Sequence, residues 1–222
     1  GRLASDLLSA LAALGSLPQR YQILETSAEL RARQKELVRR EIPHLVERIG
    51  WLDELPASLE GVIIGNEVVD AMPVHLICAQ EEGMAELGVT AADGTFAWSA
   101  RPASGPLLAA ASALALDRGY TTEIHLVACA FIRTLARHLT RGVVFLIDYG
   151  FPAREYYHPQ RDRGTLMCHY RQHVHDDPLC LIGLQDITAH VDFSALATAA
   201  TKSGLDVLGY ANQAQFLINC GI

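Results

Sequence analysis

With 222 residues and a mass of 24.2 kDa, the chain is long enough for one large domain, which excludes a mini-protein that depends on disulfides or a metal for its stability. Half of its residues are hydrophobic and only 19% are charged, so it can bury a full core and lacks the composition of a disordered protein. The formal net charge of −7 argues against a dedicated nucleic-acid binder, because phosphate contacts need a predominantly basic face.

The N-terminal segment predicts a helix, a strand and a second helix. Leucines recur on one helical face from Leu3 onward, which predicts a helix that stops at Gly15. The short apolar run 21–24 predicts a strand that ends in Glu25. Ser27 is typical of an N-cap and predicts that a highly charged helix begins there.

Two further segments predict buried strands. Residues 61–65 and 142–147 are uninterrupted apolar runs, the first followed by Asn66 and Glu67 and the second by Asp148. Strands that are apolar on both faces and separated by helical stretches are typical of a parallel sheet covered on both sides. We therefore expect an α/β fold with a Rossmann-like, mostly parallel sheet.

The rest of the chain predicts a core interrupted by two insertions. We expect the core to comprise residues 1–77, 107–150 and 193–222. Glycines and short mixed runs predict a hairpin-like insertion over 78–106, and the stretch 151–192 is too long for a passive connection. The remaining core elements are expected to be helices over 106–116, 126–139, 193–203 and 213–219 and a strand over 205–208.

Acidic residues follow three of the predicted strands, namely Glu25, Glu67 and Asp148. The carboxyl ends of parallel strands share one rim of a sheet, and ligands bind at that rim. A carboxylate has two acceptor oxygens, so Glu25 suits the two hydroxyls of a ribose. The alternative is that each carboxylate only caps the helix that follows it.

The segment after the strand 61–65 carries the sharpest cluster of polar groups. If a helix begins at Val68, then Glu67 and Asp70 lie three residues apart on one face, with Asn66 beside them. Two carboxylates and an amide can hold a cation with several donors, such as a guanidinium. An N-terminal cap of the helix is the alternative interpretation.

The second insertion is rich in histidine. Five of its polar residues invite a metal interpretation: His169, His173, His175, Asp176 and Asp177. Their spacing matches no metal motif, so we expect no metal and interpret them as solvated or hydrogen-bonded loop residues. Asp186 and His190, further along, are candidates for closing a pocket.

The compartment can be judged only coarsely. The five cysteines are scattered, which excludes a disulfide framework and favours a reducing environment. No apolar run approaches the ~20 residues that a membrane-spanning helix needs.

Five motifs occur in one order along the chain, and together they resemble one family. They are Asn66-Glu-Val-Val-Asp-Ala-Met-Pro73, Asp148-Tyr-Gly150, Glu155-Tyr-Tyr-His-Pro-Gln-Arg161, Gly164-Thr-Leu-Met-Cys-His-Tyr170 and Gln185-Asp-Ile-Thr-Ala-His-Val-Asp-Phe193. This pattern resembles the MidA-like S-adenosylmethionine-dependent methyltransferases, whose mitochondrial members are protein-arginine methyltransferases that act in complex I assembly. The resemblance implies a seven-stranded class I methyltransferase sheet, with insertions that cover the active site. It also implies that the chain lacks segments at both ends.

The resemblance also implies roles for individual residues. The cofactor S-adenosyl-L-methionine would be bound by Gly1, Glu25, Asn66 and Glu67, with Gly1 as the last glycine of a glycine-rich loop. Catalysis would fall to Asn66, Glu67 and Asp70, the two carboxylates orienting the acceptor. The substrate contacts would be Asp148, Tyr149, Tyr156, Tyr157, His158, Asp186 and His190.

We therefore expect a methyltransferase that acts on an arginine nitrogen of a protein substrate, without nucleic-acid partners, and that forms a homodimer. The compartment would be the cytoplasm of a bacterium or the mitochondrial matrix of a eukaryote. Two other functions remain open. One is a catalytically silent assembly protein with the same fold, and the other is a nicotinamide-dependent oxidoreductase, which also places an acid at the second strand tip.

Overall fold

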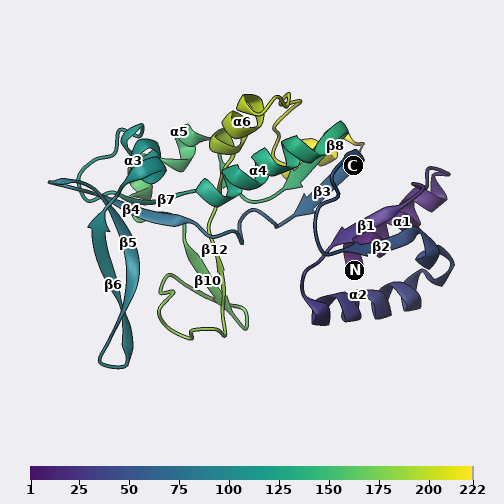
Figure 1. The fold of residues 1–222 in the computed structure, drawn as a ribbon, viewed down its shortest axis with the longest axis horizontal. Helices are drawn as coiled ribbons and strands as arrows, with labels where there is room; N and C mark the ends of the chain where they lie inside the picture. Colours follow the sequence, from purple (N-terminus) through teal and green to yellow (C-terminus); the bar gives the residue numbers. More distant parts are fainter. Residues whose placement is uncertain (222) are drawn as a thin grey trace. The chain divides into compact units, whose positions relative to one another are not determined.

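The computed structural model describes residues 1–221, apart from the side chain of Ala92, and divides into two compact units, Gly1–Ser58 and Leu59–Ile222 (Figure 1). The boundary falls inside the segment 1–77, which the sequence predicts to be continuous core. The two units are described separately. Among the residues described, no helix is long and apolar enough to cross a membrane.

The first unit contains two parallel strands and two long helices. Its elements are α1 (Arg2–Ala13), β1 (Tyr21–Leu24), α2 (Ala28–Glu41), the 3₁₀ helix η1 (Pro43–Arg48) and β2 (Ile49–Leu52). Strand β1 pairs with β2 from Tyr21 opposite Ile49 to Leu24 opposite Leu52. The predicted N-cap is confirmed, because the Ser27 hydroxyl accepts the main-chain N–H of Leu30 at 3.3 Å.

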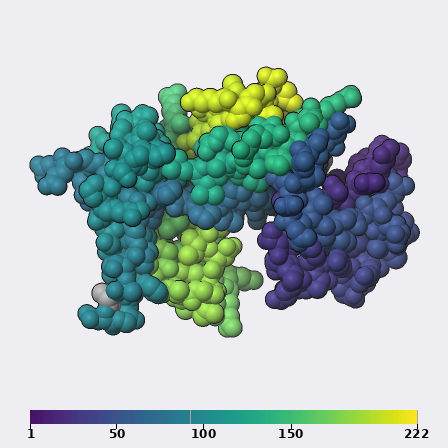
Figure 2. All heavy atoms as spheres, in the orientation of Figure 1, coloured from purple at the N-terminus to yellow at the C-terminus, as the bar shows by residue number. Residues whose placement is uncertain are grey.

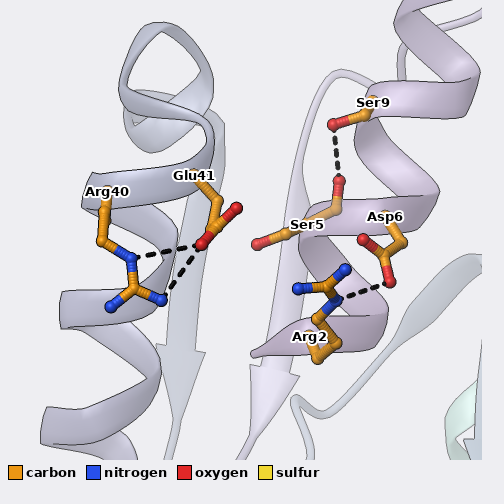
Figure 3. Close-up of polar contacts among 6 residues, drawn as sticks. All are labelled: Arg2, Ser5, Asp6, Ser9, Arg40 and Glu41. Carbon is orange, nitrogen blue, oxygen red and sulfur yellow. Dashed lines mark hydrogen bonds and ion pairs between the residues drawn. The ribbon is translucent and has the colours of Figure 1, made fainter.

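The core of this unit is apolar, whereas the ion pairs on its helices are exposed. Its buried side chains are Leu8, Val38, Ile42, Leu45 and Ile49. Figure 3 shows two exposed pairs, Arg2 with Asp6 at 2.9 Å and Arg40 with Glu41 at 3.0 Å. Exposed pairs are screened by solvent, so the apolar cluster, rather than these charges, holds the helices on the strands.

The second unit contains the remaining strands and helices. In chain order they are β3 (Leu59–Asn66), β4 (His75–Gln80), β5 (Gly83–Ala92), β6 (Thr95–Pro102), α3 (Gly105–Ser112), β7 (Thr121–Ile124), α4 (Leu126–His138), β8 (Leu139–Ile147), β9 (Gly150–Phe151), α5 (Ala153–Tyr156), η2 (Pro159–Arg161), β10 (Met167–Tyr170), β11 (His173–His175), β12 (Asp186–Thr188), β13 (Val191–Asp192), α6 (Phe193–Lys202) and α7 (Gln213–Asn219). Most of the predicted helices are therefore confirmed.

Among the described residues of this unit, parallel strands pair in two two-stranded sheets. Strands β3 and β8 run parallel and end together, with Asn66 opposite Ile147. Strands β9 and β13 form the second pair, with Gly150 opposite Val191. Because β3 and β8 end at the same level, the residues that follow them, Glu67 and Asp148, are brought to one edge.

The expected α/β fold is seen among the described residues, but its strands form both parallel and antiparallel sheets rather than one clearly parallel, Rossmann-like sheet. A four-stranded sheet in the order β6-β5-β4-β7 is antiparallel, as is the three-stranded sheet β11-β10-β12. The predicted hairpin within 78–106 is β5–β6, which turns at Asp93 and Gly94, both with positive φ. Figure 2 shows the tip of this teal hairpin extending away from the helices of its own unit.

Two predicted elements are absent from the described residues, and several strands escaped prediction. No helix begins at Val68, since residues 67–72 form a turn, and 205–208 is not a strand. In the latter segment Leu208 is 79% exposed, so its apolar pattern does not reflect burial in a sheet. The strands that were missed are β2, β4, β7 and the short strands β9 to β13, whose mixed sequences lack a clear period.

One apolar cluster of the second unit lies between α3 and the antiparallel sheet. It contains Ile77 of β4 and Ile124 of β7 together with Ala103, Leu107 and Ala111 from α3 and the residues before it. The polar segments of the candidate site, described below, are connected to β7, α4 and β8. Their backbones are therefore held by packed elements of the fold.

Candidate functional site

Glu25 lies directly after β1, and two hydrogen bonds hold its carboxylate in place. Oε1 accepts the main-chain N–H of Ser27 at 2.9 Å, and Oε2 accepts the Gln34 side-chain amide at 2.9 Å. Each carboxylate oxygen can accept a second hydrogen bond. The arrangement therefore fits a ligand that presents two hydroxyls, as the ribose of S-adenosyl-L-methionine does.

Gly1 lies close to Gln34 of α2, the residue that also contacts Glu25. A Cβ added at Gly1 would lie 3.2 Å from Gln34 Cα and 3.1 Å from Leu37 Cδ2, so a larger residue would crowd the helix. Gln34 also accepts the indole N–H of Trp51 at 2.9 Å. Gln34, which the sequence analysis missed, thus links the two predicted cofactor residues of the first unit, Gly1 and Glu25.

Arg31 links the C-terminal ends of β1 and β2 through hydrogen bonds. Its guanidinium donates to the main-chain oxygens of Glu25 and Leu52, the latter at 3.1 Å, and pairs with Asp53 at 2.6 Å. A cavity of about 210 Å³ opens beside it, lined by Thr26, Ala28, Arg31, Ala32, Lys35 and Asp53. The strand ends of the first unit therefore carry both a fixed carboxylate and an adjoining polar hollow.

In the second unit, Asp148 anchors the turn that follows β3. Its Oδ2 accepts the main-chain N–H groups of Val68 at 3.2 Å, Val69 at 2.9 Å and Asp70 at 3.4 Å. Burial raises the pKa of Asp148, and these bonds oppose the shift. The Asp148 carboxylate thus shapes this turn, which stands in place of the expected helix, and its contact with the substrate stays a prediction.

This anchoring places Glu67 and Asp70 in different environments. Glu67 is exposed and has a φ of +50°, a left-handed conformation that costs energy for a residue with a side chain. Its N–H donates to the Ile147 oxygen at 2.9 Å, which holds that conformation. Asp70 is only 3% exposed. Asn66, at the end of β3, is exposed.

Asp70 lies beside Tyr149. The Asp70 carboxylate is the largest cause of a raised pKa at Tyr149, and burial and the charges of Glu67 and Asp148 add to the shift. Asp70 Oδ1 has no hydrogen-bond partner among the described residues. The turn therefore brings an exposed carboxylate, a buried carboxylate with an open acceptor and a phenol to one place.

His190 packs against this group. Its ring meets the ring of Tyr149 edge-on at 6.0 Å between centroids and that of Phe151 at 5.3 Å. Burial lowers the pKa of His190, a shift opposed by the charge of Asp70. Five predicted site residues therefore lie together in the second unit: Glu67, Asp70, Asp148, Tyr149 and His190.

The structure places the other predicted substrate residues elsewhere. Tyr156 is fully buried, so its prediction as a substrate contact is corrected to a position in the interior. The Tyr157 hydroxyl donates to Asp192 at 2.9 Å, and His158 Nδ1 accepts the N–H of Gln160 at 3.3 Å within η2. Asp186 is exposed on β12.

A buried carboxylate that the sequence analysis missed explains the position of Tyr156. Glu123 in β7 is fully buried and accepts the Tyr156 hydroxyl at 2.7 Å. It also accepts the main-chain N–H groups of Thr165 at 2.7 Å and Leu166 at 2.9 Å, and the Thr165 hydroxyl at 3.1 Å. A charged residue inside a short strand was the one available signal, but nothing nearby in the sequence identifies its partners.

Comparison with a protein-family profile gives a match to residues 1–211, and the description of that family reads "Putative S-adenosyl-L-methionine-dependent methyltransferase". A curated relative is the mitochondrial protein arginine methyltransferase NDUFAF7 homolog of Caenorhabditis elegans. It is 26% identical over 246 residues, which cover 100% of this chain and 55% of the relative.

Two crystal structures of COG1565 superfamily proteins from Burkholderia thailandensis are also similar, each 52% identical over the whole of this chain. One, bound to S-adenosyl-homocysteine, gives a TM-score of 0.95 over 58% of its own length. The other, a native structure, gives 0.96 over 60%. This chain thus spans little more than half the length of these relatives. Because the profile matches nearly all of it, the chain belongs to this family of S-adenosyl-L-methionine-dependent methyltransferases.

Proposed function

We propose that this protein transfers the methyl group of S-adenosyl-L-methionine to a side-chain nitrogen of a protein substrate, and that the acceptor is arginine. The family supports the cofactor and the reaction class, and a 52% identical relative was solved with S-adenosyl-homocysteine, the demethylated cofactor. The acceptor is supported by a 26% identical relative named as a protein arginine methyltransferase.

The observation that carries the proposal is the arrangement of Glu67, Asp70 and Tyr149. A strained, exposed carboxylate lies at the same turn as a buried carboxylate with an open acceptor atom. Backbone strain in a residue with a side chain is concentrated at functional sites. A guanidinium presents several N–H donors in one plane and carries a charge that does not titrate near neutral pH, so it suits such a pair of acceptors.

The residues of the chain would act mainly by positioning and by electrostatics. When bound, the cofactor supplies an electrophilic methyl group, and a C–N bond forms as the C–S bond breaks and one proton leaves the guanidinium. Glu67 and Asp70 would orient the acceptor nitrogen and offset its positive charge. Asn66 would lie near the reacting methyl group. In the first unit, Glu25 would accept the ribose hydroxyls and Gly1 would leave room for the cofactor.

The remaining predictions belong to the same proposal. Tyr157, His158, Asp186 and His190 are proposed to face the protein substrate. A role in complex I assembly, a homodimer and a location in the bacterial cytoplasm or the mitochondrial matrix rest on the family resemblance.

The test is Glu67→Gln, which keeps the shape of the side chain and removes its charge. We expect labelled methyl transfer to a protein substrate to fall by about 100-fold or more, the size of effect that loss of one electrostatic contact in an active site can have. Affinity for S-adenosyl-homocysteine should stay close to wild type. Glu60→Gln, at the exposed opposite end of the same strand, is the matched control and should retain activity.

The same assay separates the other functions. Near-normal transfer by Glu67→Gln would remove Glu67 from the mechanism. Absence of label on every candidate partner, with the cofactor still bound by wild type, would favour the assembly protein. Binding of a nicotinamide dinucleotide in preference to S-adenosyl-homocysteine would favour the oxidoreductase.

A further inference from the structure

A three-residue segment, 189–191, joins the two halves of the Asp70–Tyr149 pair. The N–H of Ala189 donates to the main-chain oxygen of Asp70 at 3.0 Å, and the N–H of Val191 donates to that of Tyr149 at 2.8 Å. Asp70 and Tyr149 are 79 positions apart in the sequence, so the segment fixes the backbones of both at a single place. A shift of the segment would therefore act on the backbones of both residues.

His190, the middle residue of this segment, is hydrogen-bonded through both its main-chain N–H and its main-chain oxygen. The N–H of His190 donates to the Thr165 hydroxyl at 3.0 Å. The oxygen of His190 accepts Nε2–H of His125 at 2.8 Å. Both partners are buried, Thr165 at 6% and His125 at 3% exposure. The backbone of residue 190 is therefore fixed by side chains in the interior.

Those side chains are in turn organised by Glu123. The Thr165 hydroxyl donates to Glu123 and accepts from His190, so one oxygen atom bridges the buried carboxylate and the segment. Tyr156, which donates to Glu123, packs edge-on against the ring of His125 at 5.5 Å. A buried carboxylate is costly unless it is hydrogen-bonded, and Glu123 accepts four such bonds, so its surroundings are held in one arrangement.

We propose that Glu123 and Thr165 are positioning residues that set the Asp70–Tyr149 pair through the backbone of 189–191. The inference rests on the proposed function, because the pair is the proposed binding place of the acceptor. Glu123 and Thr165 are themselves enclosed and touch no substrate. They determine the relative placement of the groups that do.

Thr165 provides the decisive substitution. Thr165→Val keeps the shape of the side chain but removes the oxygen that links Glu123 to His190, leaving the His190 N–H without an acceptor. Thr165→Ser keeps the hydroxyl and removes only a methyl group. Thr122→Val is the matched control, since Thr122 is equally buried and lies beside Glu123 but takes no part in the bonds described above.

Two measurements distinguish positioning from a general loss of stability. Hydrogen exchange should accelerate about tenfold in Thr165→Val at the amides of Ala189 and Val191, with exchange in β4 unchanged, the size of effect expected from one buried hydrogen bond. In the methylation assay, kcat should fall about tenfold while the affinity for S-adenosyl-homocysteine is unchanged. Thr165→Ser and Thr122→Val should both stay within about twofold of wild type.

The outcomes are separable. Equal effects of Thr165→Val and Thr165→Ser would overturn the inference, as would accelerated exchange spread evenly over β4 and β7. If the wild-type protein transferred no methyl group, the proposed function would fail. The exchange measurement would still decide whether Thr165 and Glu123 hold the Asp70–Tyr149 pair.

Discussion

The Asp148 carboxylate accepts the main-chain N–H of Val69 at 2.9 Å across 79 residues of sequence. It thereby fastens the end of β8 to the turn after β3, and it shares the same oxygen with the N–H groups of two neighbouring residues. The position of Glu67 and Asp70 therefore depends on a side chain from a distant strand rather than on a local helix.

Removal of this anchor should release the turn. We expect Asp148→Ala to lower the free energy of unfolding by about 1–3 kcal/mol, because three main-chain N–H groups, two of them in part-buried hydrogen bonds, lose their acceptor. It should also speed hydrogen exchange at Val69 and reduce methyl transfer. Asp206→Ala, at an exposed position in the same unit, is the control. Urea unfolding measures the stability, and unchanged exchange at Val69 would contradict the anchoring role.

Glu25 should contribute to cofactor affinity rather than to folding. Glu25→Gln retains an oxygen that can accept the N–H of Ser27 and loses the bond from the Gln34 side chain, while the bond from Arg31 goes to the main chain of residue 25 and is unaffected. We expect affinity for S-adenosyl-homocysteine to fall by about tenfold or more, since hydrogen bonds to a charged acceptor are worth about 1.5–3 kcal/mol.

Isothermal calorimetry tests this prediction, with Glu29→Gln as the control. Glu29 is an exposed acid in the first turn of α2 and pairs with Arg33 at 3.7 Å. Wild-type affinity in Glu25→Gln would mean that the carboxylate serves only to cap α2 through Ser27.

Local patterns predicted those elements whose signals are local. Ser27 caps the helix that follows it, as its residue type indicates, and the apolar runs of β1, β3 and β8 form strands. The apolar runs did not reveal how the strands pair, because pairing depends on contacts between distant segments.

The candidate site was predictable in part for the same reason. The positions of Glu25 and Glu67 after strands follow from the sequence. The helix predicted at Val68 is absent, and the N–H groups that its cap would have satisfied are bound by Asp148, 80 residues later. Glu123 was missed because its main partner, Thr165, lies 42 residues away. A hydrogen-bond acceptor that lies far away in the sequence produces no periodic pattern from which it could be predicted.

Acid should destabilise the protein through His125. Burial lowers the pKa of His125, opposed by its bond to the His190 oxygen and by the charges of Glu123 and Asp192. The unfolded chain takes up the proton near pH 6.5, whereas the folded chain resists it to lower pH. The contribution to stability is therefore complete above about pH 6.5 and is lost as the pH falls below that value towards the lowered pKa.

Urea unfolding at pH 7.5, 6.5 and 5.5 measures this dependence. In His125→Gln the amide can still donate to the His190 oxygen but does not titrate, so stability should fall less steeply between pH 6.5 and 5.5. Some slope should remain, because burial also lowers the pKa of His190. An identical slope in the variant and wild type would exclude His125 as a source.

Gly164 should tolerate no side chain, for two separable reasons. Its φ of +77° is unfavourable for any other residue, and an added Cβ would overlap Oε1 of Glu123. Gly119 has a similar φ of +86° but open space around it, so Gly119→Ala reports the backbone cost alone. We expect about 1 kcal/mol for Gly119→Ala and about 3 kcal/mol or more for Gly164→Ala, measured by urea unfolding. Equal costs would show that the carboxylate can move aside. A larger cost at Gly164 would show that it cannot, as expected for an oxygen that already accepts the N–H groups of Thr165 and Leu166.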